Sequence, residues 1–467
     1  MKHPLEVCSA DRSTDVSGYV FEFWINGIGE MEIIEWNKLD QGAREAALGR
    51  APQNRSEKTQ LIVSDILKRV SSDGDAAIRE LTFQLDGVDL QSFRVTTEER
   101  RAAMDGLDVE VREAIDSAYQ NIKKFHHAAL PSNFSLETSS GVTCQARYLG
   151  IQSVGLYAPG GKTPLPSSVL MMGVPAELAK CKNVILCSPP SPSGEIDGAI
   201  AYAAEVCGID AVFKIGGAQA IAAMTFGTES VPACDKLFGP GSIWVTEAKR
   251  QVSVGRSATT IDMAAGPSEV MVVADKDANP VFVAVDMAAQ MEHGTDSQAI
   301  LVTESRDLAE AVVQAVLDLL PQLNRRDLIR SSSRYSRIIL VDDISQAMQV
   351  ANLYAAEHLI IQTEDADIRL EQVTAAGSVF LGRWTPEVLG DYCSGTNHVL
   401  PTCGLARSVN GLSVSDFMKR ITVQRATADG LMGLAKTATT LANAEGLTAH
   451  ALAVSIRRDA CQSGAVE

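Results

Sequence analysis

A glutamine and a histidine lie three residues apart in the segment DMAAQMEHGTDSQ, residues 286–298. Side chains with this spacing share one face of a helix, so Gln290 and His293 could hold a metal ion between them. The position of Gly294 predicts that the helix ends beside His293. The same spacing also suits a histidine that interacts only with the carboxyl end of its helix. Spacing alone leaves both interpretations open.

A glutamate and a histidine are adjacent in AAEHLIIQT, where Glu357 and His358 come at the start of an apolar strand. Adjacent strand residues point to opposite faces, so the two serve one site only if they lie at the mouth of the strand. There a histidine could act as a general base near neutral pH, and a glutamate could activate water. The alternative is a histidine that only forms hydrogen bonds at a strand end.

Two further pairs combine a carboxylate with a histidine. Asp391 and His398 lie in GDYCSGTNH, a loop after the strand GSVFLG, where functional side chains tend to project. Glu445 and His450 lie in AEGLTAH on the terminal helical segment. An ordinary surface loop is the alternative for the first pair, and a solvated helix face is the alternative for the second.

Glycine-rich turns follow three apolar strands, in GLYAPGGKTP (155–164), GGAQA (216–220) and FGPGS (238–242). Ligands of open α/β sheets dock at such turns, so these segments are either a cofactor site or purely structural turns. A P-loop nucleotide hydrolase is excluded. Its motif needs a glycine five positions before the Gly-Lys-Thr, and Leu156 occupies that position.

These residues must be positioned by the elements around them. From about residue 147, short β-branched runs such as NVILCSPP and EHLIIQT alternate with alanine-rich helical stretches. Runs that are apolar on both faces and separated by helix-length segments predict parallel sheets covered on both sides. The predicted fold class is α/β, with two doubly wound Rossmann-like units and small helical N- and C-terminal appendages.

A length of 467 residues suggests about three structural units. Residues 1–30 are interpreted as an extension of doubtful significance, on which no function is built. The expected division of the rest is a helical segment at 31–52, a first α/β domain with the catalytic and metal residues at 53–156 and 269–412, a second, cofactor-binding α/β domain at 157–268, and a helical, dimer-forming tail at 413–467.

The net charge of −17, from 58 acidic and 41 basic residues, argues against two classes of partner. No Lys/Arg-rich run offers the basic face that a nucleic acid or an anionic membrane needs. No stretch reaches the roughly 20 apolar residues of a membrane span. The nine cysteines show no C-x-x-C pair and no secretory signal is evident, so we expect free thiols and a cytoplasmic protein.

Taken in order, AGPSEVMVVAD, QMEHGTDSQ, EHLIIQT, SVFLG, GDYCSGTNHVLPT and GLTAH closely resemble the histidinol dehydrogenase family. The turns VGLYAPGG, GGAQAIAA and FGPG do so as well, and the similarity runs from Met31 to about residue 460. The resemblance implies oxidation of L-histidinol to L-histidine via L-histidinal, in two NAD-dependent steps at a bound zinc ion. These are the last steps of histidine biosynthesis.

The resemblance also assigns roles to individual residues. It makes Gln290, His293, Asp391 and His450 the ligands of one zinc ion per subunit. Two imidazoles, a carboxylate and a carboxamide leave positions open for substrate, as catalytic zinc requires. The same resemblance implies a homodimer whose C-terminal tail reaches across, so that His450 serves the zinc of the partner subunit.

The catalytic pair implied by the resemblance is Glu357 and His358. His358 would take the hydroxyl proton, and Glu357 would activate the water that hydrates the aldehyde. The implied NAD-binding residues are Tyr157, Gln219 and Ser242. The implied substrate contacts are Ser268, His398 and Glu445, together with His358 and the four zinc ligands.

Three features depart from the family pattern. Ser242 stands where the family usually has Asn, which shortens a contact to the cofactor. Thr295 replaces the usual Pro, so the turn after His293 is less rigid. Residues 1–30 have no counterpart in the family.

Two other functions are weighed against histidinol oxidation. A relative with the same fold could act on another small alcohol such as a sulfonated diol, but Glu445, His398 and the DSQ motif suit a cationic imidazole substrate. A catalytically silent metal-binding or interaction protein would be expected to lack at least one catalytic or ligand position, and this sequence retains all of them.

Overall fold

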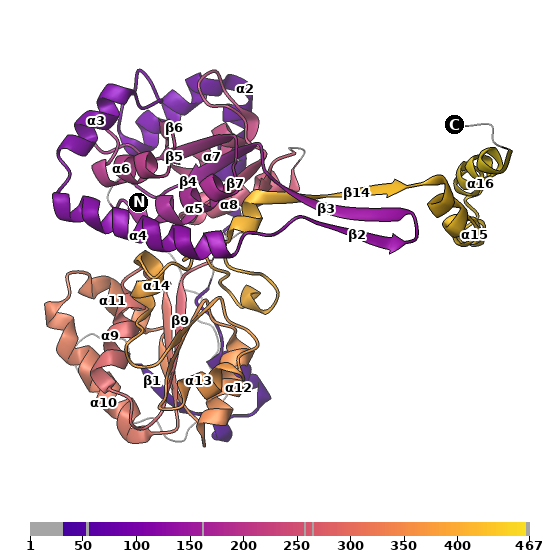
Figure 1. The fold of residues 1–467 in the computed structure, drawn as a ribbon. Helices are drawn as coiled ribbons and strands as arrows, with labels where there is room; N and C mark the ends of the chain where they lie inside the picture. Colours follow the sequence, from indigo (N-terminus) through magenta and orange to yellow (C-terminus); the bar gives the residue numbers. More distant parts are fainter. Residues whose placement is uncertain (1–30, 53–55, 161–162, 256–257, 264–265, 464–467) are drawn as a thin grey trace, which may run out of the picture.

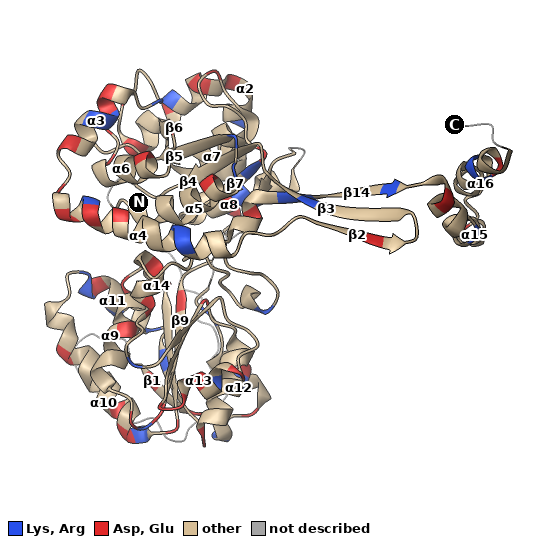
Figure 2. Ribbon diagram, in the orientation of Figure 1, with Lys and Arg blue, Asp and Glu red and all other residues tan. Residues whose placement is uncertain are grey.

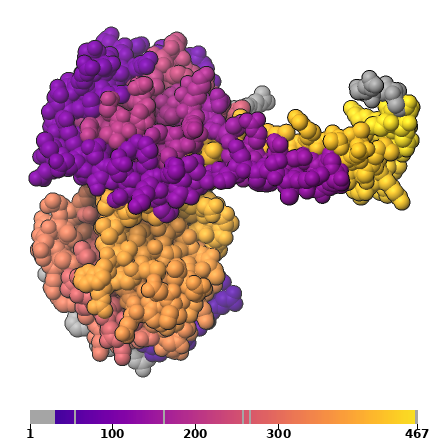
Figure 3. Space-filling model, in the orientation of Figure 1, coloured from indigo at the N-terminus to yellow at the C-terminus, as the bar shows by residue number. Residues whose placement is uncertain are grey.

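The structure is a computed structural model that describes residues 31–52, 56–160, 163–255, 258–263 and 266–463. It consists of two α/β bodies, each built on a parallel sheet, and an antiparallel arm that projects from one of them (Figure 1). The predicted α/β class with two doubly wound units is confirmed. In the space-filling view the bodies lie one above the other, and the arm extends from the upper body (Figure 3).

The lower body is built on a six-stranded parallel sheet with the order β1-β11-β10-β9-β12-β13. Every residue of β9, β10 and β12 is buried, as expected for strands that are apolar on both faces. The strands are β1 (Glu32–Glu35), β9 (Glu269–Ala274), β10 (Gln298–Thr303), β11 (Arg337–Leu340), β12 (His358–Gln362) and β13 (Ser378–Leu381).

Helices cover both faces of this sheet. Alternate residues of β9 supply the two faces: Val270 and Val272 belong to one core, and Met271 and Val273 to the other. The first core is closed by α9 (Pro280–Met291), α10 (Arg306–Leu319) and α11 (Arg326–Ser333). The second is closed by α1 (Gln41–Ala47), α12 (Ile344–Tyr354) and α13 (Ala366–Leu370).

The upper body is built on a five-stranded parallel sheet with the order β6-β5-β4-β7-β8. Its strands are β4 (Ser153–Tyr157), β5 (Asn183–Ser188), β6 (Ala211–Lys214), β7 (Lys236–Phe238) and β8 (Thr260–Ile261). One face is covered by α4 (Val109–Ala128), α5 (Pro166–Leu178) and α6 (Gly198–Val206), with α3 (Thr97–Asp105) outside α6. The other is covered by α2 (Glu57–Asp86), α7 (Gly217–Phe226) and α8 (Ile243–Val254).

This arrangement corrects two expected boundaries. Residues 53–156 were expected to join 269–412, but β4 is the central strand of the upper sheet, and Val63 and Val70 of α2 pack in its core with Ile221. The sequence shows that a helix has an apolar stripe but not which sheet the stripe covers. Residues 31–52 were expected to be helical. The segment does contain α1, but it begins with β1, which pairs in parallel with β11 and is the edge strand of the lower sheet.

The third correction concerns the C-terminal tail, which was expected to be helical throughout. It begins with β14 (Met418–Ala426), which pairs antiparallel with β3 (Val142–Gly150), and β3 pairs with β2 (Phe134–Ser139). These strands form the arm, and α15 (Ala428–Ala444) and α16 (Thr448–Ser463) lie at its far end (Figure 1). Within the described residues of these two helices, only Gly430, Ala435, Ala442 and Ala451 are buried.

Charged residues of both signs are scattered over both bodies (Figure 2). Within the described residues, no helix is both long enough and apolar enough to cross a membrane. The extension at residues 1–30 lies outside the described residues.

Candidate active site

Glu357 and His358 lie at the mouth of a strand, where adjacent residues can serve one site. His358 is the first residue of β12, and Glu357 precedes it; both side chains are buried. The Glu357 carboxylate accepts a hydrogen bond from the backbone N–H of Glu269, the first residue of the neighbouring strand β9, at 3.0 Å. This pair therefore lies at the amino end of the lower sheet, where its parallel strands begin.

The His358 imidazole lies between two carboxylates. Its Nδ1 is 3.7 Å from Oε2 of Glu357, and its Nε2 is 3.4 Å from Oδ1 of Asp391. Asp391 is carried by the short helix α14 (Glu387–Tyr392). Within the described residues, neither ring nitrogen forms a hydrogen bond of ordinary geometry. Each ring nitrogen instead faces a carboxylate, so the ring lies between two groups with which it can exchange a proton.

Electrostatics at this cluster are set by burial and by several nearby carboxylates. Burial acts to lower the pKa of His358, but Glu357, Glu387 and Asp391 outweigh it and raise the pKa to about 10. Burial raises the pKa of Glu357 to about 7. The surrounding carboxylates thus favour the imidazolium, and neutralising one of them would lower the pKa of His358.

The predicted helix with Gln290 and His293 is α9. Asn279 caps it by accepting hydrogen bonds from two backbone N–H groups, and the helix ends at Met291, just before His293. Gln290 Nε2 and His293 Nδ1 are 3.4 Å apart, so the two side chains share one face, as predicted. The Asp391 charge acts on the His293 ring, whose pKa is lowered chiefly by burial. α9 and α14 thus bring Gln290, His293 and Asp391 together.

One atom of this group lacks a partner. Gln290 is fully buried, and its Oε1 has no hydrogen-bond partner in the described part of the chain. Burying a carboxamide oxygen without a partner is costly, and a cation would satisfy it. Within the same residues, no three His, Cys, Asp or Glu side chains are grouped closely enough to hold a metal ion.

Two of the predicted residues lie far from this cluster. Glu445 ends α15 and His450 lies in α16, at the tip of the arm, and both are exposed (Figure 1). One copy of the chain therefore does not bring Glu445 and His450 to the cluster formed by Gln290, His293, Glu357, His358 and Asp391.

His398 links the two bodies. Its Nδ1 is 2.9 Å from the backbone oxygen of Asp391, and its Nε2 is 3.3 Å from the hydroxyl of Ser168 on α5. The neighbouring Asn397 donates a hydrogen bond to the backbone oxygen of Met171 on the same helix. The amino end of the lower sheet therefore faces the upper body. Ser268 lies at this end, directly before β9.

The residues expected at the cofactor follow three strands of the upper sheet. Tyr157 ends β4, and Gln219 lies in the first turn of α7 after β6. Ser242 occupies the N-cap position of α8 after β7, without a capping hydrogen bond from its side chain. The chain runs from β4 outward through β5 and β6, and β7 then returns to the other side of β4. Open α/β sheets bind ligands at the carboxyl ends of strands at such a switch point.

Close contacts shape these turns. The Tyr157 hydroxyl accepts a hydrogen bond from the Gly217 backbone N–H at 3.1 Å. A Cβ on Gly239, whose φ is +129°, would lie 2.1 Å from the Tyr157 backbone oxygen, so this turn requires glycine. Gln219 is buried, and its Oε1 has no partner among the described residues, whereas Ser242 is exposed. The Gln219 oxygen is thus available to a ligand.

Two buried carboxyl groups near the site were not singled out from the sequence. Glu387 is buried one helical turn before Asp391, and neither of its oxygens has a partner in the described residues. The spacing of four in PEVLGDY was the signal that could have found it. Burial raises the pKa of Glu387 to about 8. Asp286 on α9 accepts a hydrogen bond from Gln362 Nε2 at 2.7 Å.

Replacing Asp286 with asparagine is expected to change how stability depends on pH. Burial raises the pKa of Asp286 from 3.8 to about 7, so folding favours the protonated acid. Its contribution to stability is complete below about pH 4 and is lost as the pH rises through 7. An asparagine side chain at this position has no such loss, so D286N should gain roughly 1–3 kcal/mol on the wild type between pH 5 and pH 8.

Urea unfolding of both proteins at several pH values measures this difference. The exposed Asp327 offers a matched control, since D327N should leave the pH profile unchanged. Parallel profiles for D286N and the wild type would show that Asp286 is ionised in the folded protein.

Comparison with known proteins gives a consistent result. The family model for histidinol dehydrogenase matches residues 49–458. A histidinol dehydrogenase of Xanthomonas euvesicatoria is 49% identical over 427 residues, covering 91% of this chain and 99% of the relative. One of Vibrio parahaemolyticus is 48% identical, covering 91% of this chain and 98% of the relative. The crystal structure of histidinol dehydrogenase from Elizabethkingia anophelis matches with a TM-score of 0.89 and 41% identity, over 92% of this chain and 99% of the other.

Proposed function

This chain belongs to the histidinol dehydrogenase family of NAD-dependent oxidoreductases, and on that premise we propose that it oxidises L-histidinol to L-histidine. The reaction proceeds through L-histidinal in two NAD-dependent steps at a bound zinc ion, and it ends histidine biosynthesis in the cytoplasm. The observation that carries the proposal is the buried His358, whose two ring nitrogens face the carboxylates of Glu357 and Asp391.

In the first step His358 takes the proton of the substrate hydroxyl. NAD would supply the hydride acceptor for both oxidations. Glu357 then activates the water that hydrates the aldehyde before the second step. Burial supports this role, because it raises the pKa of the Glu357 carboxyl to about 7, close to that of an effective general base.

The metal site we propose uses Gln290, His293 and Asp391 of one subunit and His450 of the partner subunit. Oxygen and nitrogen donors of this kind suit zinc, and the unpartnered Oε1 of Gln290 fits a ligand role. Zinc, when bound, supplies a Lewis acid that anchors the substrate and polarises its oxygen.

The other contacts that we propose are those to NAD and to the substrate. Tyr157, Gln219 and Ser242 line the NAD site at the carboxyl ends of β4, β6 and β7. Ser268 and His398 lie at the amino end of the lower sheet, which faces the upper body. Glu445 of the partner subunit pairs with the positively charged amino group of the substrate.

The arm supports our proposal of a homodimer. One chain leaves apolar side chains exposed on the arm helices, among them Leu441, Leu452 and Ile456. Exposed apolar surface of this kind marks protein–protein contact sites. A second copy that covers these helices would also bring Glu445 and His450 of the arm to the other subunit's cluster.

The test is NADH formation by purified, zinc-loaded protein with L-histidinol or a sulfonated diol as substrate. We expect two NADH per L-histidinol consumed, loss of activity after treatment with a chelator, and recovery on addition of zinc. A protein that contains zinc and oxidises only the diol would identify an altered-substrate relative. A zinc-containing protein without turnover of either substrate would contradict the proposal.

A further inference from the structure

We propose that Arg50 is a positioning residue for Glu357 and acts through Glu269. The inference rests on the proposed function, in which Glu357 activates water for the second oxidation. It adds to the site a residue that lies 307 positions before Glu357 in the chain and outside every motif considered above.

Arg50 forms a two-pronged ion pair with Glu269. Its Nε lies 2.5 Å from Oε2 and its Nη2 lies 2.9 Å from Oε1 of the carboxylate. The guanidinium also donates a hydrogen bond to the backbone oxygen of Tyr354 at 2.6 Å and lies 4.0 Å from the centre of its ring. Such planar, bidentate pairing fixes the carboxylate in orientation as well as in position.

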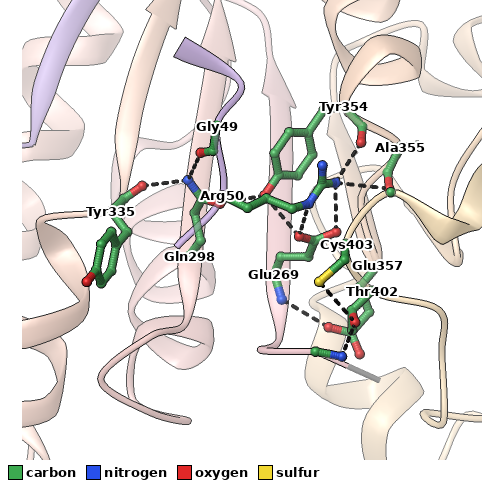
Figure 4. Close-up of polar contacts among 12 residues, drawn as sticks. Gly49, Arg50, Glu269, Gln298, Tyr335, Tyr354, Ala355, Glu357, Thr402 and Cys403 are labelled. Atoms are coloured by element: carbon green, nitrogen blue, oxygen red, sulfur yellow. Dashed lines mark hydrogen bonds and ion pairs between the residues drawn. The ribbon is translucent and has the colours of Figure 1, made fainter. Parts of the chain in front are cut away.

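Glu269 connects this ion pair to the site. Its side chain binds Arg50, and its backbone N–H donates the 3.0 Å hydrogen bond to Oε2 of Glu357 (Figure 4). Glu269 is the first residue of β9, and the peptide unit that carries its N–H is held on the other side, where the Ser268 backbone oxygen accepts a hydrogen bond from the Gln298 N–H at 3.2 Å. Anchoring the Glu269 side chain adds a second constraint on the direction of the N–H that orients Glu357.

The partners around Glu269 are themselves held in place. The Tyr354 hydroxyl lies 3.2 Å from the Glu269 carboxylate and donates to Gln298 Oε1 at 2.8 Å. Gln298 Nε2 donates to the backbone oxygens of Gly49 and Tyr335, at 3.0 and 2.7 Å (Figure 4). A buried network in which each member is satisfied holds its groups rigidly. Rigid support within a fraction of an ångström is what a catalytic carboxylate needs.

Stability alone gives a weak reason for this pair. Burying an Arg–Glu pair costs desolvation, and apolar side chains of similar volume are often as stabilising. Without Arg50, a buried negative charge would stand unpaired beside Glu357 and repel its carboxylate. The second oxidation, which needs Glu357, should then suffer more than the first, which needs His358.

The test separates the two oxidations in the full-length, zinc-loaded protein. R50M removes the positive charge and keeps an unbranched side chain. R50K keeps the charge but cannot form the two parallel hydrogen bonds to the Glu269 carboxylate. We expect R50M to lower the rate with L-histidinal roughly 10- to 100-fold, while the first NADH formed from L-histidinol in a single turnover slows by less than about threefold. R50K should lie between R50M and the wild type.

Arg44 on α1 provides a matched control. Its Nε donates a hydrogen bond to the backbone oxygen of Trp36 at 3.3 Å and its guanidinium lies 5.1 Å from the centre of the Trp36 ring, and no contact with Glu269 is found among the described residues. R44M should therefore leave the ratio of the two oxidation rates unchanged. Should R50M fail to fold, R50K carries the same comparison.

Equal slowing of both oxidations in R50M, or no slowing in either, would overturn the inference. A wild-type protein that oxidises both substrates shows that such a result concerns Arg50 alone. A wild-type protein that oxidises neither L-histidinol nor L-histidinal would overturn the proposed function, and the role inferred for Arg50 would be overturned as well.

Discussion

Replacement of His358 by asparagine is expected to lower the turnover of L-histidinol by roughly 10²- to 10⁴-fold. Asparagine is of similar size but cannot take a proton near neutral pH. His358 lies against Glu357 and Asp391 without being one of the proposed ligands, so zinc content should stay close to that of the wild type. Steady-state kinetics and metal analysis of the same preparation measure both quantities.

The control uses the same substitution at an exposed histidine. His127 lies on the outer side of α4, and H127N should leave turnover unchanged. Loss of zinc from H358N would show that His358 is a ligand, and the proposed division between base and ligands would then be wrong.

Mixing two inactive variants is expected to restore activity if the site is shared between subunits. H450A lacks a ligand on the arm, and H358N lacks the base in the body. In a heterodimer, the body of the H450A subunit receives an intact His450 from the partner subunit, so one of the two sites is complete. Random pairing at equal concentrations should give about a quarter of the wild-type rate.

Each variant alone sets the baseline for this experiment. Heterodimers can be isolated with two different affinity tags, and their activity per subunit should be about half that of the wild type. Isolated heterodimers without activity would mean that His450 acts within its own chain or not at all. In that case the position of α16, far from the cluster in one chain, would need another explanation.

Local patterns in the sequence predicted local geometry well. The cap, the end and the shared face of α9 follow from the residues of that segment alone, and the structure places Gln290 and His293 as predicted. The glycine turns were likewise expected at the carboxyl ends of strands, where the structure has them. In both cases the determining contacts lie within a few residues of one another.

Contacts between distant segments could not be predicted in this way. The apolar stripe of α2 fits either sheet, and only the folded chain shows that it covers the upper one. Arg50 and Glu269 are separated by 219 positions, so no spacing rule connects them. The unpartnered oxygens of Glu387 likewise become visible only once the surrounding elements are in place.

All of the proposed catalytic residues of the lower body lie at the amino end of its sheet. The opposite, carboxyl end has no proposed catalytic role. The loops at the carboxyl end include the exposed Lys276, two residues after β9, among the acidic side chains of Asp275, Asp277 and Glu304. An enzyme immobilised on a bead or an electrode through this lysine would be held at the end of the lower sheet opposite to the proposed active site. The carboxyl end of the lower sheet is therefore a suitable place for attachment.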